Sequence, residues 1–221
     1  MSHIRTVVIV ILITSSLVLT GCADDRPRDK VIIFDTAHRP IFSQYSELKK
    51  IFRESGFNVV DGGVENLDGA SAYLLMGPAH KVDEQEIAKF VENGGILFIA
   101  IHIPPSNLEN LLEEFGFYVE KEPIKRQIVT GIPLVEHPLT SGIEEITMYG
   151  CFRVSNPIIG EKKETMSFSS EKDMGIVGFA KYGEGFIIVA GDDAAFTDQH
   201  INSSDNRKFI QNIAHFISDK S

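Results

Sequence analysis

Hydrophobic residues along this chain fall into short continuous runs that alternate with amphipathic segments. The runs at residues 31–34, 72–76 and 96–101 are apolar throughout, and a short run at 57–60 is apolar except for Asn58. Continuous apolar runs bounded by turn residues are typical of strands that are covered on both faces, as in parallel sheets. The pattern therefore predicts four buried strands in the first half of the chain.

The segments between these runs have helical periodicity. Apolar side chains recur every three or four residues in segments 45–52, 82–91, 108–115 and, near the end, 209–217. Residues 203–205 (Ser-Ser-Asp) are good N-cap residues for the last of these helices. Alternating strands and helices with short connections predict right-handed βαβ units. We expect a flavodoxin-like or Rossmann-like α/β fold, with a mostly parallel sheet and helices on both faces.

The second half of the domain departs from this alternation. Residues 117–174 are rich in β-formers and prolines, which predicts a β-rich insertion of short strands and loops at the edge of the sheet. Two apolar runs then follow at 175–181 and 186–190, and the glycine-rich residues 182–185 join them. This spacing indicates a β-hairpin.

The N-terminal residues have the pattern of an export signal. Arg5 precedes an apolar run at residues 7–19, which is shorter than the roughly 20 residues that a membrane span needs. The run ends in Leu-Thr-Gly-Cys at residues 19–22, which resembles a lipobox. We therefore expect a lipoprotein signal peptide at 1–21, a tether at 22–30 and one α/β domain at 31–221. An uncut signal anchor and a secretory signal cut nearby are the alternatives.

Lipidation of Cys22 would place the protein on the outer face of the cell membrane, with the membrane as its first partner. The formal net charge of −10 argues against nucleic acid as a second partner, because an acidic surface repels phosphate backbones. The only other cysteine, Cys151, would then have no disulfide partner. We expect its thiol to be a small buried hydrophobic group.

Polar residues gather where the predicted strands end, which is where open α/β sheets bind ligands. The candidate ligand-binding residues are Asp35, His38, His80, His102, Asp192 and Asp193. Histidine and aspartate together can hold a divalent metal or transfer a proton. No locally spaced metal motif is present, so we predict a binding crevice and no cofactor, and a divalent metal stays an alternative. Asp35 could instead fasten the turn at 36–40, and Asp192 and Asp193 could hold the loop before the last helix.

Several segments in order resemble the class I glutamine amidotransferase-like superfamily, in particular its non-catalytic branch of uncharacterised and GIFT-type domains. They are Val31–Asp35, Asn93–Leu97, the His-Pro-Leu-Thr-Ser-Gly-Ile segment at 137–143, and the glycine turn at 182–185 that leads to Gly191-Asp192 and Asp205-Asn206. The resemblance covers roughly residues 31 to 218, and it implies the superfamily's α/β fold.

The sequence departs from the superfamily where its chemistry would be. Active members place a cysteine in a G-x-C-x-G elbow after the strand that corresponds to residues 96–101, and here that position reads Ile101-His102-Ile103-Pro104. Acyl transfer by a thiolate needs that nucleophile. We therefore predict a lipoprotein domain that binds a small molecule, a glycan or a protein without catalysis. A hydrolase that uses the His/Asp residues, with or without a metal, is the alternative, and an assembly component of an envelope complex is a third interpretation.

Overall fold

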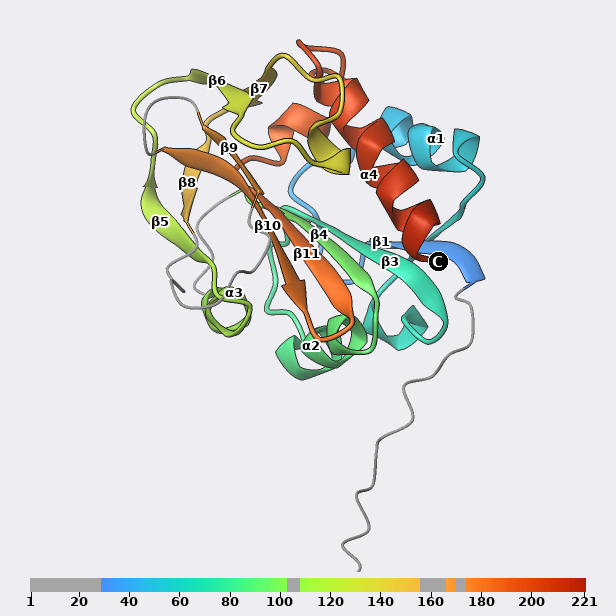
Figure 1. The fold of residues 1–221 in the computed structure, drawn as a ribbon. Helices are drawn as coiled ribbons and strands as arrows, with labels where there is room; N and C mark the ends of the chain where they lie inside the picture. The colour runs from blue at the N-terminus through green and yellow to red at the C-terminus, as the bar shows by residue number, and fades with distance from the viewer. Residues whose placement is uncertain (1–28, 103–107, 156–165, 170–173) are drawn as a thin grey trace, which may run out of the picture.

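The computed structural model describes residues 29–102, 108–155, 166–169 and 174–221 (Figure 1). The predicted signal peptide and Cys22 lie outside the described residues. The helices are α1 (Ser46–Glu54), α2 (Glu84–Glu92), α3 (Glu109–Glu114) and α4 (Asn206–Lys220), with short 3₁₀ helices η1 (Val64–Asn66), η2 (Pro138–Thr140) and η3 (Ala194–Phe196). The strands are β1 (Asp29–Asp35), β2 (Asn58–Gly62), β3 (Ala70–Met76), β4 (Ile96–Ala100), β5 (Tyr118–Pro123), β6 (Ile128–Pro133), β7 (Ile146–Tyr149), β8 (Phe152–Ser155), β9 (Met166–Ser169), β10 (Gly175–Tyr182) and β11 (Gly185–Ala190).

The main sheet has the strand order β2-β1-β3-β4-β11-β10-β9-β6-β7. Strands β2, β1, β3, β4 and β11 are all parallel, and β10, β9, β6 and β7 continue the sheet with antiparallel pairing. The parallel strands are continuously apolar because each face is covered, and β3, β4 and β11 are buried at every position. The predicted α/β fold is confirmed.

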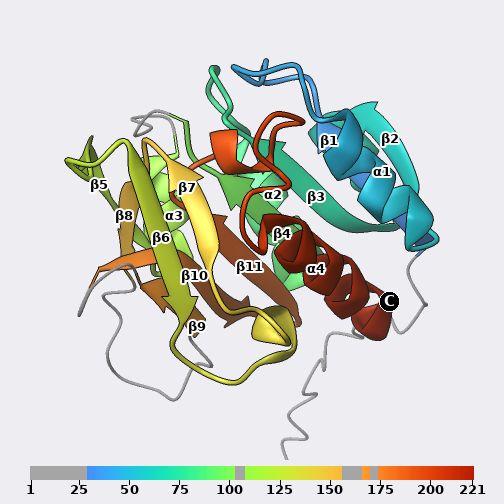
Figure 2. The ribbon, with the colours of Figure 1, turned by 90° about the horizontal axis from the view of Figure 1, so that it is seen from above.

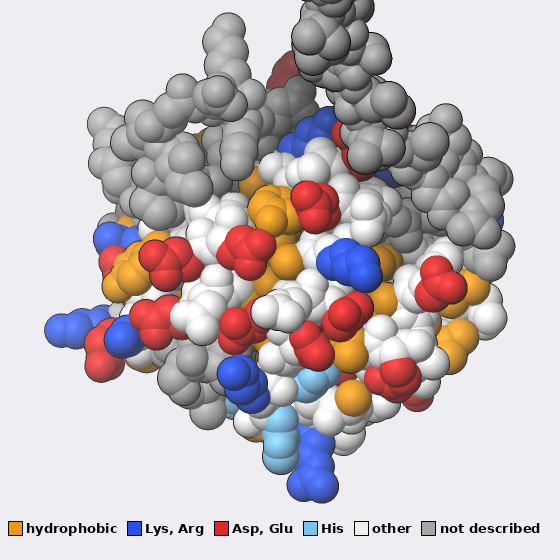
Figure 3. All heavy atoms as spheres, turned by 90° about the horizontal axis from the view of Figure 1, so that it is seen from below, with side chains coloured by type: hydrophobic (Ala, Val, Ile, Leu, Met, Phe, Trp, Pro, Cys, Tyr) orange, Lys and Arg blue, Asp and Glu red, His pale blue; other side chains and the backbone are white. Residues whose placement is uncertain are grey.

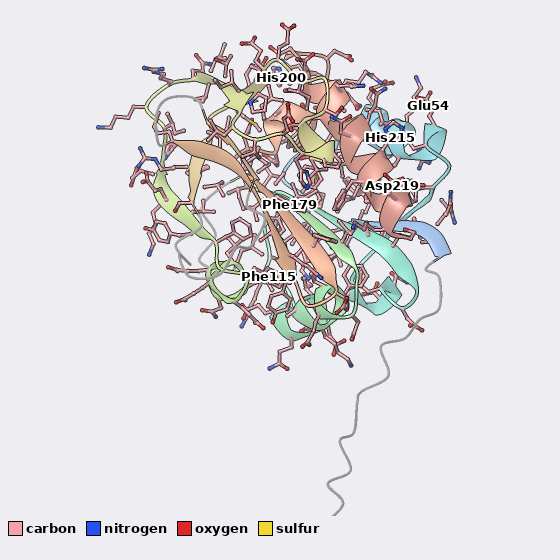
Figure 4. All side chains as sticks on the ribbon, viewed as in Figure 1. Glu54, Phe115, Phe179, His200, His215 and Asp219 are labelled. Atoms are coloured by element: carbon pink, nitrogen blue, oxygen red, sulfur yellow. The ribbon has the colours of Figure 1, made fainter. Side chains whose placement is uncertain are left out.

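Helices cover both faces of the sheet (Figure 1). Helices α1 and α4 lie over one face, and α2 and α3 lie over the other. Alternate side chains of a strand point to opposite faces, so β4 sends Phe98 into the first layer and Leu97 into the second. Two separate hydrophobic cores result, one on each side of the sheet. In Figure 4 the labelled Phe179 and Phe115 lie on opposite sides of the sheet in these two cores.

The β-rich insertion has two parts that the sequence alone did not separate. Strands β6, β7 and β9 join the main sheet, whereas β5 and β8 form a small antiparallel sheet of their own. The hairpin of β10 and β11 forms as expected around Gly183, whose φ of +56° suits a glycine. At the start of the domain, β1 begins at Asp29, so the last two residues of the predicted tether belong to a strand.

The N-terminus of α4 differs in one detail from its prediction. Asp205 occupies the N-cap position, but its side chain makes no cap hydrogen bond. Its carboxylate instead accepts hydrogen bonds from the backbone N–H groups of Glu144 and Glu145, at 2.8 and 3.2 Å. The helix start is therefore tied to the loop before β7, a contact between residues about 60 positions apart that local sequence cannot reveal.

Among the helices of the described residues, none combines the length and the apolar character required to cross a bilayer.

Candidate functional site

A buried carboxylate at the end of β1 organises the first part of the site. Asp35 has no exposed surface, and its Oδ1 accepts a hydrogen bond from Nδ1 of His38 at 2.8 Å. The hydroxyl of Tyr73, from β3, donates to the same carboxylate at 2.7 Å. The backbone N–H of His38 donates to Oδ2 at 3.2 Å, so Asp35 also fastens the turn that follows β1. We call these three residues the Asp35 cluster.

A second group of the same composition lies beyond β3 and β4, the two strands between β1 and β11. Asp193, which follows β11, is also fully buried, and its Oδ1 accepts a hydrogen bond from Nδ1 of His102 at 2.9 Å. The hydroxyl of Tyr45 donates to Oδ2 at 3.0 Å. We call these residues the Asp193 cluster. Each cluster thus joins one buried carboxylate to one imidazole and one phenol, although no sequence repeat predicts this.

The two clusters are parts of one continuous edge. The loop at residues 38–42 runs along the loop at 77–80, where Ala79 and His80 donate backbone hydrogen bonds to the carbonyl of His38 at 2.9 and 3.1 Å. At the other end of the same loop, the Phe42 ring meets the His102 imidazole edge-on with ring centroids 4.9 Å apart. Because only β3 separates β1 from β4, the strand ends beneath His38 and His102 are about 10 Å apart.

The start of α1 holds Tyr45 in place. The helix has no side-chain cap of its own at Tyr45. Asp198 supplies it from the loop after η3, accepting hydrogen bonds from the hydroxyl of Ser46 and from the backbone N–H of Glu47. Backbone donors at a helix start and the helix dipole both favour a carboxylate there, and these hydrogen bonds help to hold the pKa of Asp198 below its usual value.

The imidazoles are the parts of the two clusters that reach the surface. The His38 side chain is 11% exposed and that of His102 is 27% exposed, whereas both aspartates are inaccessible. Since each Nδ1 binds a carboxylate, the Nε2 atom of each ring is the atom left for a ligand. The hydrogen bond to Asp35 raises the pKa of His38, and the hydrogen bond to Asp193 raises that of His102, although burial opposes both shifts.

Asp192 has a different role from Asp193. It is 3% exposed, and its carboxylate accepts backbone hydrogen bonds from Tyr149 at 2.6 Å, Ala194 at 3.0 Å and Ala195 at 3.1 Å. Burial raises its pKa to about 7, against the effect of these three donors. Asp192 therefore connects the end of β7 to η3. This agrees with the alternative from the sequence, in which Asp192 holds the loop before the last helix.

The structure places the six sequence-predicted residues at different depths. The three imidazoles of His38, His80 and His102 lie at or near the surface, and we call them the histidine rim. His80 is exposed. Asp35 and Asp193 each orient one imidazole by a hydrogen bond, whereas Asp192 accepts hydrogen bonds from backbone N–H groups. Sequence reasoning missed Tyr45 and Tyr73, since both lie in apolar patterns that predicted core positions.

The remaining candidates for chemistry are structural. Cys151 is free and fully buried, and burial raises the pKa of its thiol well above the usual value, which disfavours a nucleophilic thiolate. His200, which is labelled in Figure 4, stacks on Tyr149 with ring centroids 3.8 Å apart. Over the residues that the structure describes, no group of three or more His, Cys, Asp or Glu side chains could hold a metal ion.

Two exposed cations lie in the loops that carry His38 and His80. Arg39 and Lys81 are exposed beside His38 and His80 in the two paired loops. Figure 3, which looks at the face covered by α2 and α3, shows carboxylates spread over the molecule and histidine with Lys or Arg side chains at the lower border. Figure 2 shows the loops after β1 and β3 together at one end of the sheet.

Comparison with known structures places this arrangement in the class I glutamine amidotransferase-like fold. The N-terminal domain of mmIFT52 superposes with a TM-score of 0.68 at 17% identity, over 85% of this chain and 97% of that domain. A cytoplasmic protein, STM1381, from Salmonella typhimurium LT2 gives 0.63 at 14% identity, over 85% and 98% of the two chains. A ThuA-like protein from Bacteroides uniformis gives 0.54 at 16% identity, over 87% and 91%. These identities establish the fold alone.

The sequence identifies the family within this fold. The family model described as a domain of unknown function, DUF4350, matches residues 38–214, and the chain belongs to that family. The match includes His38 and both clusters apart from Asp35. The search of curated proteins found no match.

Proposed function

We propose that this protein is a membrane-anchored, extracytoplasmic domain that binds a ligand at the histidine rim without catalysis. One observation carries the site: two buried aspartates each fix a partly exposed imidazole through Nδ1, at 2.8 and 2.9 Å, which leaves its Nε2 as the ring nitrogen for a ligand. Buried carboxylates are costly to desolvate, and hydrogen bonds from an imidazole and a phenol offset that cost. If these positions had no function, a solvent-exposed polar residue could occupy each of them without this desolvation cost.

The same geometry argues for binding rather than for the chemistry associated with this fold. The elbow position after β4 carries His102 in place of a cysteine, and the thiol of Cys151 is buried. Without a cysteine at the elbow, acyl transfer through a thioester intermediate is not available to this site. A second candidate, hydrolysis, is favoured by the His102–Asp193 pair, because an imidazole oriented by a carboxylate can act as a general base toward water.

Binding at the rim can be measured by NMR of the imidazole signals in the full-length chain. We expect saturable shifts of the His38 and His102 signals with at least one probe among glucose, glucuronate, glucose 6-phosphate and the dipeptide Ala-Ala. The signals of His200 and His215 serve as internal controls. If every probe leaves the rim signals unchanged, or shifts only the control signals, the proposed binding site is wrong. Turnover of p-nitrophenyl acetate that disappears in His102→Gln would favour the hydrolase instead.

The proposed anchor has an independent test at Cys22. The Cys22→Ser variant should no longer incorporate radiolabelled palmitate, and it should move from the membrane fraction to the soluble extract, because a hydroxyl cannot accept the thioether-linked lipid. A Cys151→Ser variant is the matched control and should stay lipidated and membrane-bound. Retention of Cys22→Ser in the membrane fraction after a carbonate wash would instead indicate an uncut signal anchor.

A further inference from the structure

We propose that the ligand of the histidine rim is an organic acid, whose carboxylate or phosphate is bound by the imidazoles and whose carbon body lies on the apolar surface between them. This inference rests on the proposed function, because it names the class of ligand for the same site. Three features of the rim support it: the hydrogen-bond donors of the imidazoles, the charged side chains around them and the apolar side chains between them.

The protonated imidazoles can donate a hydrogen bond to a ligand from Nε2. When protonated, each ring uses its Nδ1–H for the buried aspartate and presents an Nε2–H with positive charge. Hydrogen bonds from a charged donor to an anion are stronger than those between neutral groups. The aspartates raise the pKa of both histidines, which keeps this donor form at a higher pH than for a free imidazole.

The charges around the rim also favour an anion. Arg39 and Lys81 are exposed on the two paired loops, and neither makes an ion pair with any residue that the structure describes. By contrast, Lys49 and Arg207 elsewhere in the domain bind carboxylates. In a protein with a net charge of −10, this edge thus offers two cations that no described carboxylate pairs with.

Opposing charges near the rim set a limit on this effect. Asp35, Glu65 and Asp83 act on His38, and Asp192 and Asp193 act on His102. Asp35 and Asp193 offset the charge of the imidazoles that they bind, so each pair attracts an anion mainly through the directed Nε2–H donor. Glu65, Asp83 and Asp192 weaken the attraction for an anion further.

The surface between the imidazoles suits an organic ligand better than an inorganic ion. The strand ends beneath His38 and His102 are about 10 Å apart, so the rim is wider than one phosphate or sulfate ion. The loop that spans this gap carries Ile41, which is 46% exposed, and Phe42, whose ring packs on His102. A carbon skeleton can cover these side chains while its acidic group reaches an imidazole.

The test is calorimetric titration of the full-length chain at pH 6 and constant ionic strength. Glucuronate and glucose 6-phosphate are the carboxylate and phosphate probes, and glucose is the neutral match for both. We expect heat of binding with at least one acidic probe and none with glucose, and which acidic probe binds decides between carboxylate and phosphate. The affinity should fall as the pH is raised to 9, because the imidazoles lose their positive charge.

Variants assign the binding to the rim. His38→Gln and His102→Gln should each weaken the acidic probe by roughly tenfold to a hundredfold, the range expected for one charge-assisted hydrogen bond. His215→Gln, on the outer face of α4, is the matched control and should bind like the natural protein (Figure 4). Glucose binding as tightly as the acids would overturn the organic-acid proposal and leave the binding site standing. No heat with any probe, together with unchanged rim signals by NMR, would overturn both.

Discussion

Replacing Gly77 with alanine is expected to lower the free energy of unfolding by about 3–4 kcal/mol and to disturb the Asp193 cluster. Gly77 follows β3 with a φ of +49°, where a Cβ costs roughly 1–2 kcal/mol. A Cβ at this position would also lie 2.1 Å from Oδ2 of Asp193 and 3.0 Å from Cβ of His102. Because Asp193 is buried and bound on both oxygens, it cannot move aside cheaply, and crowding of this kind costs about 1–3 kcal/mol more.

Urea unfolding separates the clash from the backbone cost when Gly77→Ala is compared with Gly142→Ala. Gly142 has a similar φ of +66°, but the nearest atom to an added Cβ is 3.6 Å away, an ordinary contact. The control should therefore lose only the backbone cost of roughly 1–2 kcal/mol. The NMR signal of His102 should shift in Gly77→Ala and stay in place in Gly142→Ala. Equal losses in the two variants would mean that Gly77 has no steric role in the site.

The second large effect is expected for Asn206→Asp, with a loss of about 3–5 kcal/mol at neutral pH. Asn206 is fully buried at the start of α4, and its amide nitrogen lies within hydrogen-bond distance of the carbonyls of Thr147, Ala195 and His200, at 2.8, 3.2 and 3.3 Å. Its oxygen accepts from the N–H of Thr147 at 2.8 Å. Aspartate has nearly the same shape, but it would direct a carboxylate oxygen at three acceptors, which is an unpaired buried charge.

The pH dependence identifies this mechanism. A carboxyl that is destabilised in its charged form has a folded pKa above the unfolded value of about 4. Its proton then restores one donor, so the stability deficit of Asn206→Asp should be smallest near pH 4 and grow as the pH rises toward neutrality. Asn58→Asp, on the exposed surface of β2, should change stability by no more than about 0.5 kcal/mol. A deficit for Asn206→Asp that is independent of pH would contradict the proposed repulsion.

The arrangement of the site explains why part of it could be predicted. The carboxyl ends of parallel strands share one edge, so residues that follow β1, β3, β4 and β11 had to lie along that edge once the strands were recognised. The sequence therefore indicated His38, His80 and His102 correctly as strand-end residues. The sequence did not indicate that the two carboxylates bound to these imidazoles are buried. Asp35 and Asp193 look like loop carboxylates in sequence, yet neither has any exposed surface.

The two tyrosines show more clearly what the sequence pattern could not predict. Tyr73 lies within a buried strand, and Tyr45 lies at the N-cap of α1, in line with the helix's apolar residues. Periodicity assigns such residues to the core, and both are indeed buried. Their hydroxyl groups nevertheless end at the two site carboxylates, and for Tyr45 the partner is 148 residues away. Hydrophobic pattern reports which face a side chain is on, but not which polar atom its far end meets.

The sequence by itself determined the alternation of buried strands and amphipathic helices, the hairpin near the C-terminus and the edge on which polar residues gather. These follow from local periodicity, because strand and helix faces repeat every few residues. Only the tertiary structure decided that three strands of the insertion extend the main sheet, and that Asp192 holds backbone while Asp193 orients an imidazole. These outcomes depend on contacts between distant segments, and adjacent residues of identical type carry no local signal that distinguishes them.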